Sequence, residues 1–271
     1  MKRLRFTLLG TGSSGGVPRI GNDWGACDPA EPKNRRMRCS ALADVYDAEA
    51  PDELTRILID TSPDLREQLL GVNVQHLDAI VFTHDHADQT HGIDDVRALA
   101  IRHRRQIDTY MDSPTRGTLV PKFRYCFEGA GGYPAILNLK DDITPYKTFE
   151  LNGQGGDVSF EPLLQQHGRI PSLGFRIGSL AYCNDLNGLP DATLERLLDL
   201  DVLILDALRY TPHPSHAHLE KALGWILQLK PKRAVLTNLH VDFDYATLCS
   251  ELPDGVEPAY DGWAVDLALD A

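Results

Sequence analysis

The chain has 271 residues, of which 42% are hydrophobic and 24% are charged, and this composition excludes wholesale disorder. Its 27 Lys and Arg against 39 Asp and Glu leave a net charge of −12. Such an acidic excess repels phosphate backbones, which argues against a general nucleic-acid binder that depends on counterion release.

The sequence shows neither a membrane-spanning segment nor a secretory signal, and this indicates its cellular compartment. No stretch approaches about eighteen consecutive apolar residues, and MKRLRFTLLGTG has too short an apolar core for a secretory signal. We therefore expect a cytoplasmic protein without a membrane partner. The five cysteines are widely spaced and form no CxxC pair, so neither a disulfide framework nor a cysteine-based zinc site is expected.

The first half of the chain predicts strands around a glycine-rich turn. Residues 5–9 are expected to form a strand, and the turn over 10–16 lacks the Gly-Lys-Ser/Thr ending of a P-loop. Residues 19–39 form a loop too long for a simple connection, which predicts a functional or site-covering role. Further strands are expected at 41–46, 56–59, 79–83 and 108–111, with helices at 63–70 (Ser62 as N-cap) and 94–101.

The second half changes its pattern from strands to alternating helices and strands. Strands are expected at 158–165, 173–177 and 180–183. Helices at 191–198 and 219–229 then alternate with strands at 202–205 and 234–236. This order predicts a single domain over residues 1–271, with helices packed outside two layers of sheet.

The most informative segment is a cluster of histidines after the apolar run 77–82. It reads His84-x-His86-x-Asp88. If the strand stops at Thr83, a turn brings His84 and His86 to one point, while Asp88 faces a second point nearby. Imidazole and carboxylate are ligands that divalent metals prefer, so this segment predicts a metal site.

These residues resemble the HxHxDH signature of the metallo-β-lactamase fold. Four more motifs follow the order of that fold, and together they span nearly the whole chain: Asp60 after a strand, Gln166-His167, Asn184-Asp185, and Leu236 to His240. The resemblance implies an αββα sandwich, an α/β (α+β) fold of four layers.

Within that superfamily the chain is most similar to the cyclic phosphodiesterases of phosphonate degradation. The similarity lies in residues 10–18, 185–190 and 206–216. It implies an enzyme that hydrolyses a small nucleotide or cyclic ribose phosphate through a metal-activated hydroxide. The partner would be a small phosphodiester rather than a nucleic-acid polymer, because no Lys-rich arm is visible. The sequence does not decide whether the chain forms a homodimer.

The resemblance also assigns the ligands of one or two divalent ions, zinc or manganese. His84, His86, His167 and Asp185 would hold the first ion, and Asp185 would bridge to a second ion beside Asp88. The expected catalytic residues are Asp88 and His216, because His216 matches the general acid that protonates the leaving group. Asp60 is expected to orient a ligand, and Arg19 and His213 to bind substrate.

The chain departs from the family at the second metal site. Gln89 stands where the signature ends in His, and Asn238 where the last strand end usually supplies His. An amide binds metal through a hard carbonyl oxygen, so we expect this site to shift from Zn²⁺ towards Mn²⁺, Mg²⁺ or Fe²⁺. His240 lies two residues after Asn238 and would share its face if the strand continues, which leaves either residue as the last ligand. His91 is a further donor, or a hydrogen-bonding residue that orients a ligand.

A second departure concerns the structural zinc of that subfamily. Its CxCxxC motif is reduced here to Asn22-x-Trp24-x-x-Cys27, so no structural zinc is expected.

Two other functions stay open at this point. The first is an ester, thioester or lactam hydrolase of the same fold, which would not need His216 as a proton donor. The second is a nucleotide-binding protein with a degraded second metal site, which Gln89 and Asn238 favour.

Overall fold

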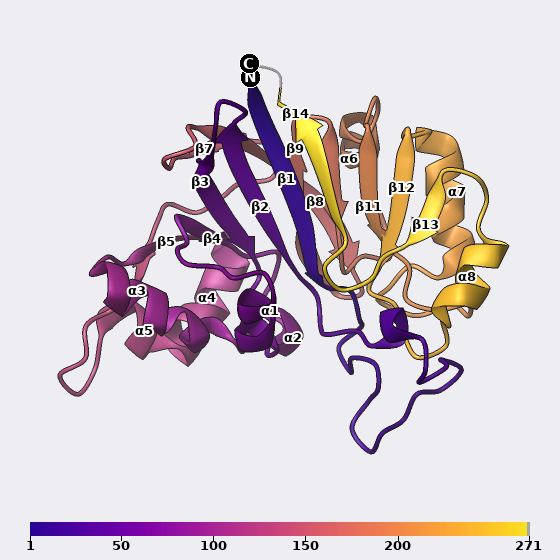
Figure 1. The fold of residues 1–271 in the computed structure, drawn as a ribbon, viewed down its shortest axis with the longest axis horizontal. Coiled ribbons are helices and arrows are strands. Elements are labelled where there is room, and N and C mark those ends of the chain that lie inside the picture. Colours follow the sequence, from indigo (N-terminus) through magenta and orange to yellow (C-terminus); the bar gives the residue numbers. More distant parts are fainter. Residues whose placement is uncertain (270–271) are drawn as a thin grey trace.

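Two seven-stranded sheets face each other in the computed structural model, which describes residues 1–269 (Figure 1). The first sheet has the order β14-β1-β2-β3-β4-β5-β6. Its strands are β1 (Lys2–Gly10), β2 (Ser40–Asp47), β3 (Ala50–Ile59), β4 (Ala79–Val81), β5 (Ile107–Tyr110), β6 (Leu137–Leu139) and β14 (Ala264–Ala268).

The second sheet is built entirely from the second half of the chain, in the order β13-β12-β11-β10-β9-β8-β7. Its strands are β7 (Phe149–Leu151), β8 (Val158–His167), β9 (Ile170–Ile177), β10 (Leu180–Cys183), β11 (Val202–Asp206), β12 (Arg233–Thr237) and β13 (Val256–Pro258). Strands β10, β11 and β12 run parallel, as the predicted alternation of helix and strand requires.

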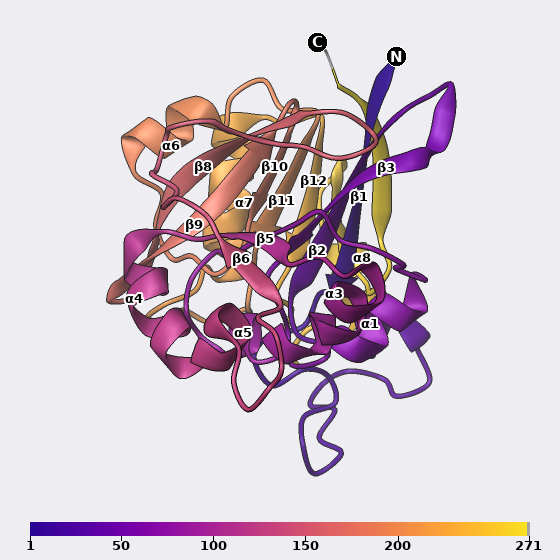
Figure 2. The same cartoon turned by 90° about the vertical axis from the view of Figure 1, so that its left-hand side faces the viewer.

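Helices cover the outer faces of both sheets (Figures 1 and 2). The first sheet carries α1 (Leu65–Gly71), α2 (Ala87–Thr90), α3 (Arg97–His103), α4 (Ser113–Lys122) and α5 (Arg124–Glu128). The second carries α6 (Asp191–Arg196), α7 (Leu219–Leu229) and α8 (Tyr245–Glu251). Each helical layer packs on its sheet through a separate apolar cluster. The predicted αββα sandwich is therefore confirmed. None of the helices formed by residues 1–269 combines the length and apolar character that a membrane span needs.

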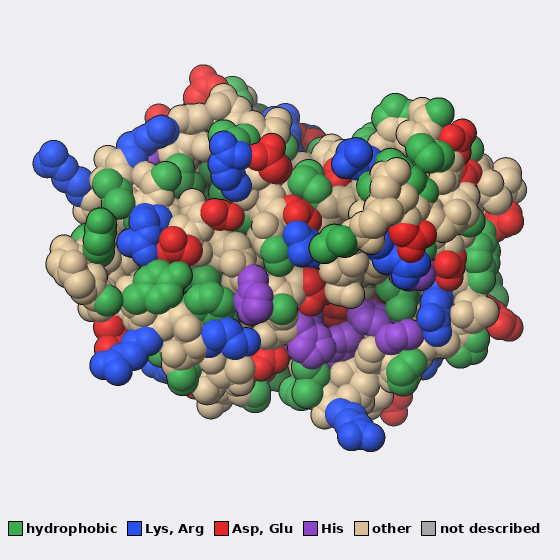
Figure 3. Space-filling model, turned by 90° about the horizontal axis from the view of Figure 1, so that it is seen from below, with side chains coloured by type: hydrophobic (Ala, Val, Ile, Leu, Met, Phe, Trp, Pro, Cys, Tyr) green, Lys and Arg blue, Asp and Glu red, His purple; other side chains and the backbone are tan. Residues whose placement is uncertain are grey.

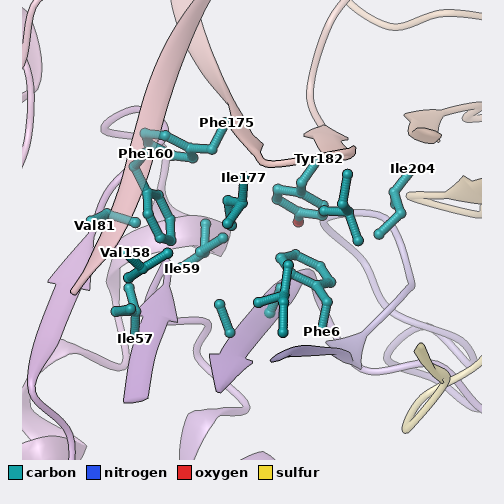
Figure 4. Close-up of a cluster of buried hydrophobic side chains, with 14 of the residues drawn as sticks. Phe6, Ile57, Ile59, Val81, Val158, Phe160, Phe175, Ile177, Tyr182 and Ile204 are labelled. Carbon is teal, nitrogen blue, oxygen red and sulfur yellow. The ribbon is translucent and has the colours of Figure 1, made fainter. Parts of the chain in front are cut away.

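The interior between the sheets is apolar and mostly aliphatic, and it includes several aromatic rings (Figure 4). Phe6 of the first sheet lies 5.7 Å from Tyr182 of the second, measured between ring centroids, and Phe160 lies 5.8 Å from Phe175. Replacing a buried Phe by Ala costs about 3–5 kcal/mol in typical cores. This layer therefore holds the two sheets firmly against each other.

Some predicted elements differ from the structure at their ends. The helix expected at 63–70 begins only at Leu65, with Asp64 as N-cap, because the Ser62 hydroxyl accepts a bond from the Asp64 amide and closes a turn first. The helix expected at 94–101 is divided into a 3₁₀ turn (Ile93–Val96) and α3. Helices α2, α4, α5 and α8 and strands β6, β7, β13 and β14 were not predicted.

Candidate metal centre

Polar residues follow the apolar strands at one edge of the two sheets. Asp60 follows β3, Asp185 follows β10 and Asn238 follows β12. Each has a left-handed backbone, with φ of 62°, 54° and 64°. Asp and Asn adopt this conformation more readily than most residues, so they can turn the chain sharply where each strand ends.

Three imidazoles from both sheets meet at this edge. His84 follows β4, His86 precedes α2, and His167 is the last residue of β8. Their ring centroids lie 4.6 to 5.1 Å apart, and one ring nitrogen from each lies within 4.8 Å of the others. Figure 3 shows histidine side chains gathered on this face of the molecule, next to acidic groups.

A hydrogen-bonded chain orients His84. The Thr83 amide donates to Asp60 Oδ1 (2.8 Å), and the Thr83 hydroxyl donates to Asp60 Oδ2 (2.8 Å). Burial raises the pKa of Asp60 to about 8, whereas the two Thr83 donors favour the carboxylate. When Asp60 is ionised, the Thr83 hydroxyl hydrogen is used on Oδ2, so Thr83 Oγ1 accepts from His84 Nδ1, 2.9 Å away. His84 Nε2 is then left as a buried lone pair without a partner.

His167 is oriented in the same way by a backbone carbonyl. Its Nδ1 lies 2.7 Å from the Ser215 carbonyl oxygen, which can only accept, so Nδ1 carries the hydrogen. Its Nε2 faces His86 Nδ1 at 3.2 Å. Burial, with a smaller effect from His216, lowers the pKa of His167 to about 4, which keeps the ring neutral.

These nitrogens fit a divalent cation. Neutral imidazoles with unshared lone pairs, each oriented by a hydrogen bond on the other nitrogen, are the usual form of protein metal ligands. The orphaned, buried Nε2 of His84 is the clearest sign, since a buried polar atom is normally paired.

The orientation of His84 can be tested at Asp60. In Asp60→Asn the side-chain amide would donate to Thr83 Oγ1, so the Thr83 hydroxyl would donate to His84 Nδ1 instead. This favours the His84 tautomer with its hydrogen on Nε2, which leaves no lone pair there for a metal ion. We expect zinc affinity to fall by about 10- to 100-fold, measured by competition with a chromogenic chelator. Thr83→Ser keeps the hydroxyl and should retain the affinity. Unchanged zinc affinity in Asp60→Asn would contradict the orienting role.

Asp185 is surrounded by amide groups. Its Oδ2 accepts from Asn184 Nδ2 (2.7 Å) and Gln89 Nε2 (2.9 Å), and its Oδ1 accepts from Asn238 Nδ2 (3.3 Å). Gln89 Nε2 also lies 3.4 Å from Asp88 Oδ2. Burial, together with Asp88, raises the pKa of Asp185, and His216 opposes this rise.

His216 forms a pair with Asp206 beside the imidazole cluster. Its Nδ1 lies 2.9 Å from Asp206 Oδ2 and 3.6 Å from Asp185 Oδ1, and its ring centroid lies 4.7 Å from that of His167. Burial lowers the pKa of His216, but the Asp206 carboxylate outweighs it and raises the pKa to about 9. The ring therefore holds a proton next to the candidate metal site.

The expectation for His240 depended on a continuing strand, and that premise is wrong. Strand β12 ends at Thr237, and the left-handed backbone of Asn238 ends the alternation of side chains. His240 Nε2 lies 3.3 Å from Arg19 Nη1, and its Nδ1 lies 3.2 Å from Asp242. Among the described residues, both clusters of potential metal ligands form without it.

The other three predicted residues lie around the site. His91 packs edge-on against Phe123, with ring centroids 5.6 Å apart. Arg19 pairs with Asp23 and lines a cavity of about 1130 Å³ beneath the loop 14–38. His213 Nδ1 accepts from the Ser215 amide (3.3 Å), and its ring lies 5.1 Å from His216.

Three residues that contact the clustered histidines received no role from the sequence: Thr83, Asp206 and Ser215. For Asp206 a signal was present, because it ends the apolar run 202–205 as Asp60 ends 56–59. The contributions of Thr83 and the Ser215 carbonyl depend on contacts with distant strand ends, so local sequence carried no sign of them.

The αββα sandwich and the imidazole cluster at its edge define a hydrolase of the metallo-β-lactamase fold, and they imply a divalent metal. The protein-family model described as "Beta-lactamase superfamily domain" matches residues 55–238, so the chain belongs to that superfamily.

Within the superfamily the chain is related to the PhnP family. The crystal structure of "a New Diphosphatase from the PhnP Family" is 35% identical, with a TM-score of 0.87, and the match covers 99% of both chains. Zn²⁺-bound PqqB from Methylobacterium extorquens shares the fold at 16% identity, with a TM-score of 0.72 and coverage of 97% of this chain and 100% of that one.

A curated relative has a different name. The octanoyltransferase of Porphyromonas gingivalis is 33% identical over 265 residues, which cover 96% of this chain and 51% of that protein. The chain thus spans about half the length of the curated relative it matches.

Proposed function

We propose that the chain is a metal-dependent phosphodiesterase that acts on a small nucleotide, cyclic ribose phosphate or diphosphate. The observation that carries this proposal is the His216–Asp206 pair beside three converging imidazoles. Cleavage of a phosphodiester releases a poor alkoxide leaving group, which needs a proton, whereas metal ligands alone would serve many hydrolases.

The residues have distinct proposed roles. His84, His86 and His167 hold the metal ion, with Asp185 beside them. The bound ion would supply a water that is deprotonated near neutral pH and would polarise the phosphoryl group. His216 donates its proton to the leaving oxygen, and Asp206 orients the ring through Nδ1. Asp88 adds a second carboxylate next to Asp185.

The loop cavity has the size for a small substrate and carries charges of both signs. Its wall combines five cationic residues (Arg19, Lys33, Arg35, Arg36 and Arg38) with four acidic ones (Asp23, Asp64, Glu67 and Asp261). Its nearly balanced charge contrasts with the net charge of −12 of the whole chain. A small phosphate compound can enter such a cavity, whereas the acidic surface as a whole repels a long phosphate chain.

An activity screen tests the proposal. We expect the manganese- or zinc-loaded enzyme to hydrolyse bis(p-nitrophenyl) phosphate and at least one cyclic nucleotide, and a chelator to abolish both activities. The carboxylic ester p-nitrophenyl octanoate should be cleaved poorly. Hydrolysis of the ester without any phosphodiesterase activity would contradict the proposal.

A second candidate, hydrolysis of an acyl ester or thioester, is favoured by the relative named octanoyltransferase. The same metal ligands would serve it, but the thiolate of a thioester leaves without help, so His216 would have little to do in thioester hydrolysis. The comparison of phosphate and octanoyl substrates separates the two functions.

A further inference from the structure

We infer that the chain holds a single metal ion, at His84, His86 and His167, and that the amides of Gln89 and Asn238 replace a second ion. The inference rests on the proposed metal centre but not on any substrate. It also replaces the expectation that harder amide oxygens would retain a second ion.

The side-chain nitrogen of Gln89 lies between the carboxylates of Asp185 and Asp88. It is 2.9 Å from Asp185 Oδ2 and 3.4 Å from Asp88 Oδ2, so one amide group faces both carboxylates. An N–H donor supplies part of the positive charge that a metal ion would bring to this pair. Gln89 is 1% exposed, so water has little access to this position.

Asn238 closes the other side of Asp185. Its Nδ2 lies 3.3 Å from Asp185 Oδ1 and 3.1 Å from His216 Nδ1. Asn184 adds a third donor to the same carboxylate at 2.7 Å. Both oxygens of Asp185 are therefore satisfied by amide groups, and this carboxylate needs no second cation.

Turning the Gln89 amide around to offer an oxygen ligand would be costly. Its carbonyl oxygen would then face Asp185 Oδ2 and Asp88 Oδ2, so acceptors would meet in a buried place where lost hydrogen bonds are expensive. A second ion would have to offset the loss of this donor and bind with amide oxygens in place of imidazoles. The donor set therefore fits amide hydrogen bonds better than a second metal ion.

Metal stoichiometry tests the inference without reference to activity. Metal-free protein would be titrated by calorimetry with ZnCl₂ and, separately, with MnCl₂, and desalted samples analysed by elemental mass spectrometry. We expect one equivalent per chain for either metal. Two tightly bound equivalents would overturn the inference, while no bound metal would overturn it together with the proposed metal centre.

A double variant tests the amides themselves. Gln89→His with Asn238→His should raise zinc stoichiometry from one to two, and His tolerates the left-handed backbone at position 238. The control Gln228→His adds an imidazole on the exposed face of α7 and should leave the zinc stoichiometry at one ion per chain. A folded double variant that still binds one zinc would overturn the role of the amides.

If the double variant does not fold, the single variant Gln89→Glu preserves the shape of the side chain. It replaces a donor between Asp88 and Asp185 with a third carboxylate, which attracts a hard cation. We expect a second equivalent of Mn²⁺ to bind to it. Retention of a single Mn²⁺ would overturn the proposal that Gln89 excludes the second ion.

Discussion

His86→Ala is expected to leave the protein folded but without bound metal, and hydrolysis should fall to background. His86 contributes Nδ1 to the cluster, 3.2 Å from His167 Nε2, and it is exposed, so its removal leaves the core intact. Two remaining imidazoles cannot complete the three-ligand set that catalytic metal sites use. Elemental analysis after desalting measures the metal content, and circular dichroism verifies the fold.

The matched control removes an imidazole elsewhere. His103 is exposed at the end of α3 and belongs to neither group of potential metal ligands, so His103→Ala should retain metal and activity. If His86→Ala kept its full metal content, the ligand assignment would be wrong.

His216→Ala should lower turnover by about 10²- to 10⁴-fold on a substrate with an alkoxide leaving group. His216 is the protonated ring beside the cluster, and without it the departing oxygen leaves as an unstable anion. Bis(p-nitrophenyl) phosphate has a good leaving group that needs little protonation, so its hydrolysis should fall much less. The measurement is the fold-loss of kcat on each of the two substrates, and the ratio of these fold-losses tests the role of His216 as a proton donor.

Two other outcomes would assign His216 differently. Equal losses on both substrates would mean that His216 positions the phosphate or its own loop, and no loss would mean a purely structural role. His218→Ala is a suitable control, because His218 is the N-cap of α7 and makes no side-chain capping bond. Its turnover should be close to that of the unchanged enzyme.

The gathering of the proposed metal ligands was predictable because these residues are close in sequence or follow recognisable strands. His84 and His86 are two residues apart after an apolar run, and His167 and Asp185 each end a strand with a clear apolar pattern. The sandwich was predictable for a related reason, since buried strands and an amphipathic helix such as α7 carry strong periodic patterns.

Other features depended on where the chain turns, which sequence alone specifies poorly. The position of His240 followed from assuming that a strand continues past Thr237, and one left-handed residue, Asn238, overturned that assumption. The orientation of the amides at Gln89 and Asn238 depends on Asp185, a residue distant in sequence from both. The sequence could show that these amides were unusual, but only the fold shows that they point at one carboxylate.

Two missed helices had local signals at their start. Asp112 accepts from the Thr115 amide at 3.0 Å before α4, and Asp244 accepts from the Thr247 amide at 2.9 Å before α8. Such Asp N-caps are readable in a sequence. The apolar pattern of both helices is weak, however, because only two residues of α4 and one of α8 are buried.

The division of the imidazoles between the two sheets has a consequence for the order of folding. His86 and His167 are separated by 81 positions in the chain, so their nitrogens meet only after both sheets have formed and docked. Contacts between such distant segments form late, because a long loop must close first. The metal ion should therefore bind after the two sheets have assembled, which is the rate-limiting step of folding. It should also slow unfolding, because it joins two sheets that must separate when the chain unfolds.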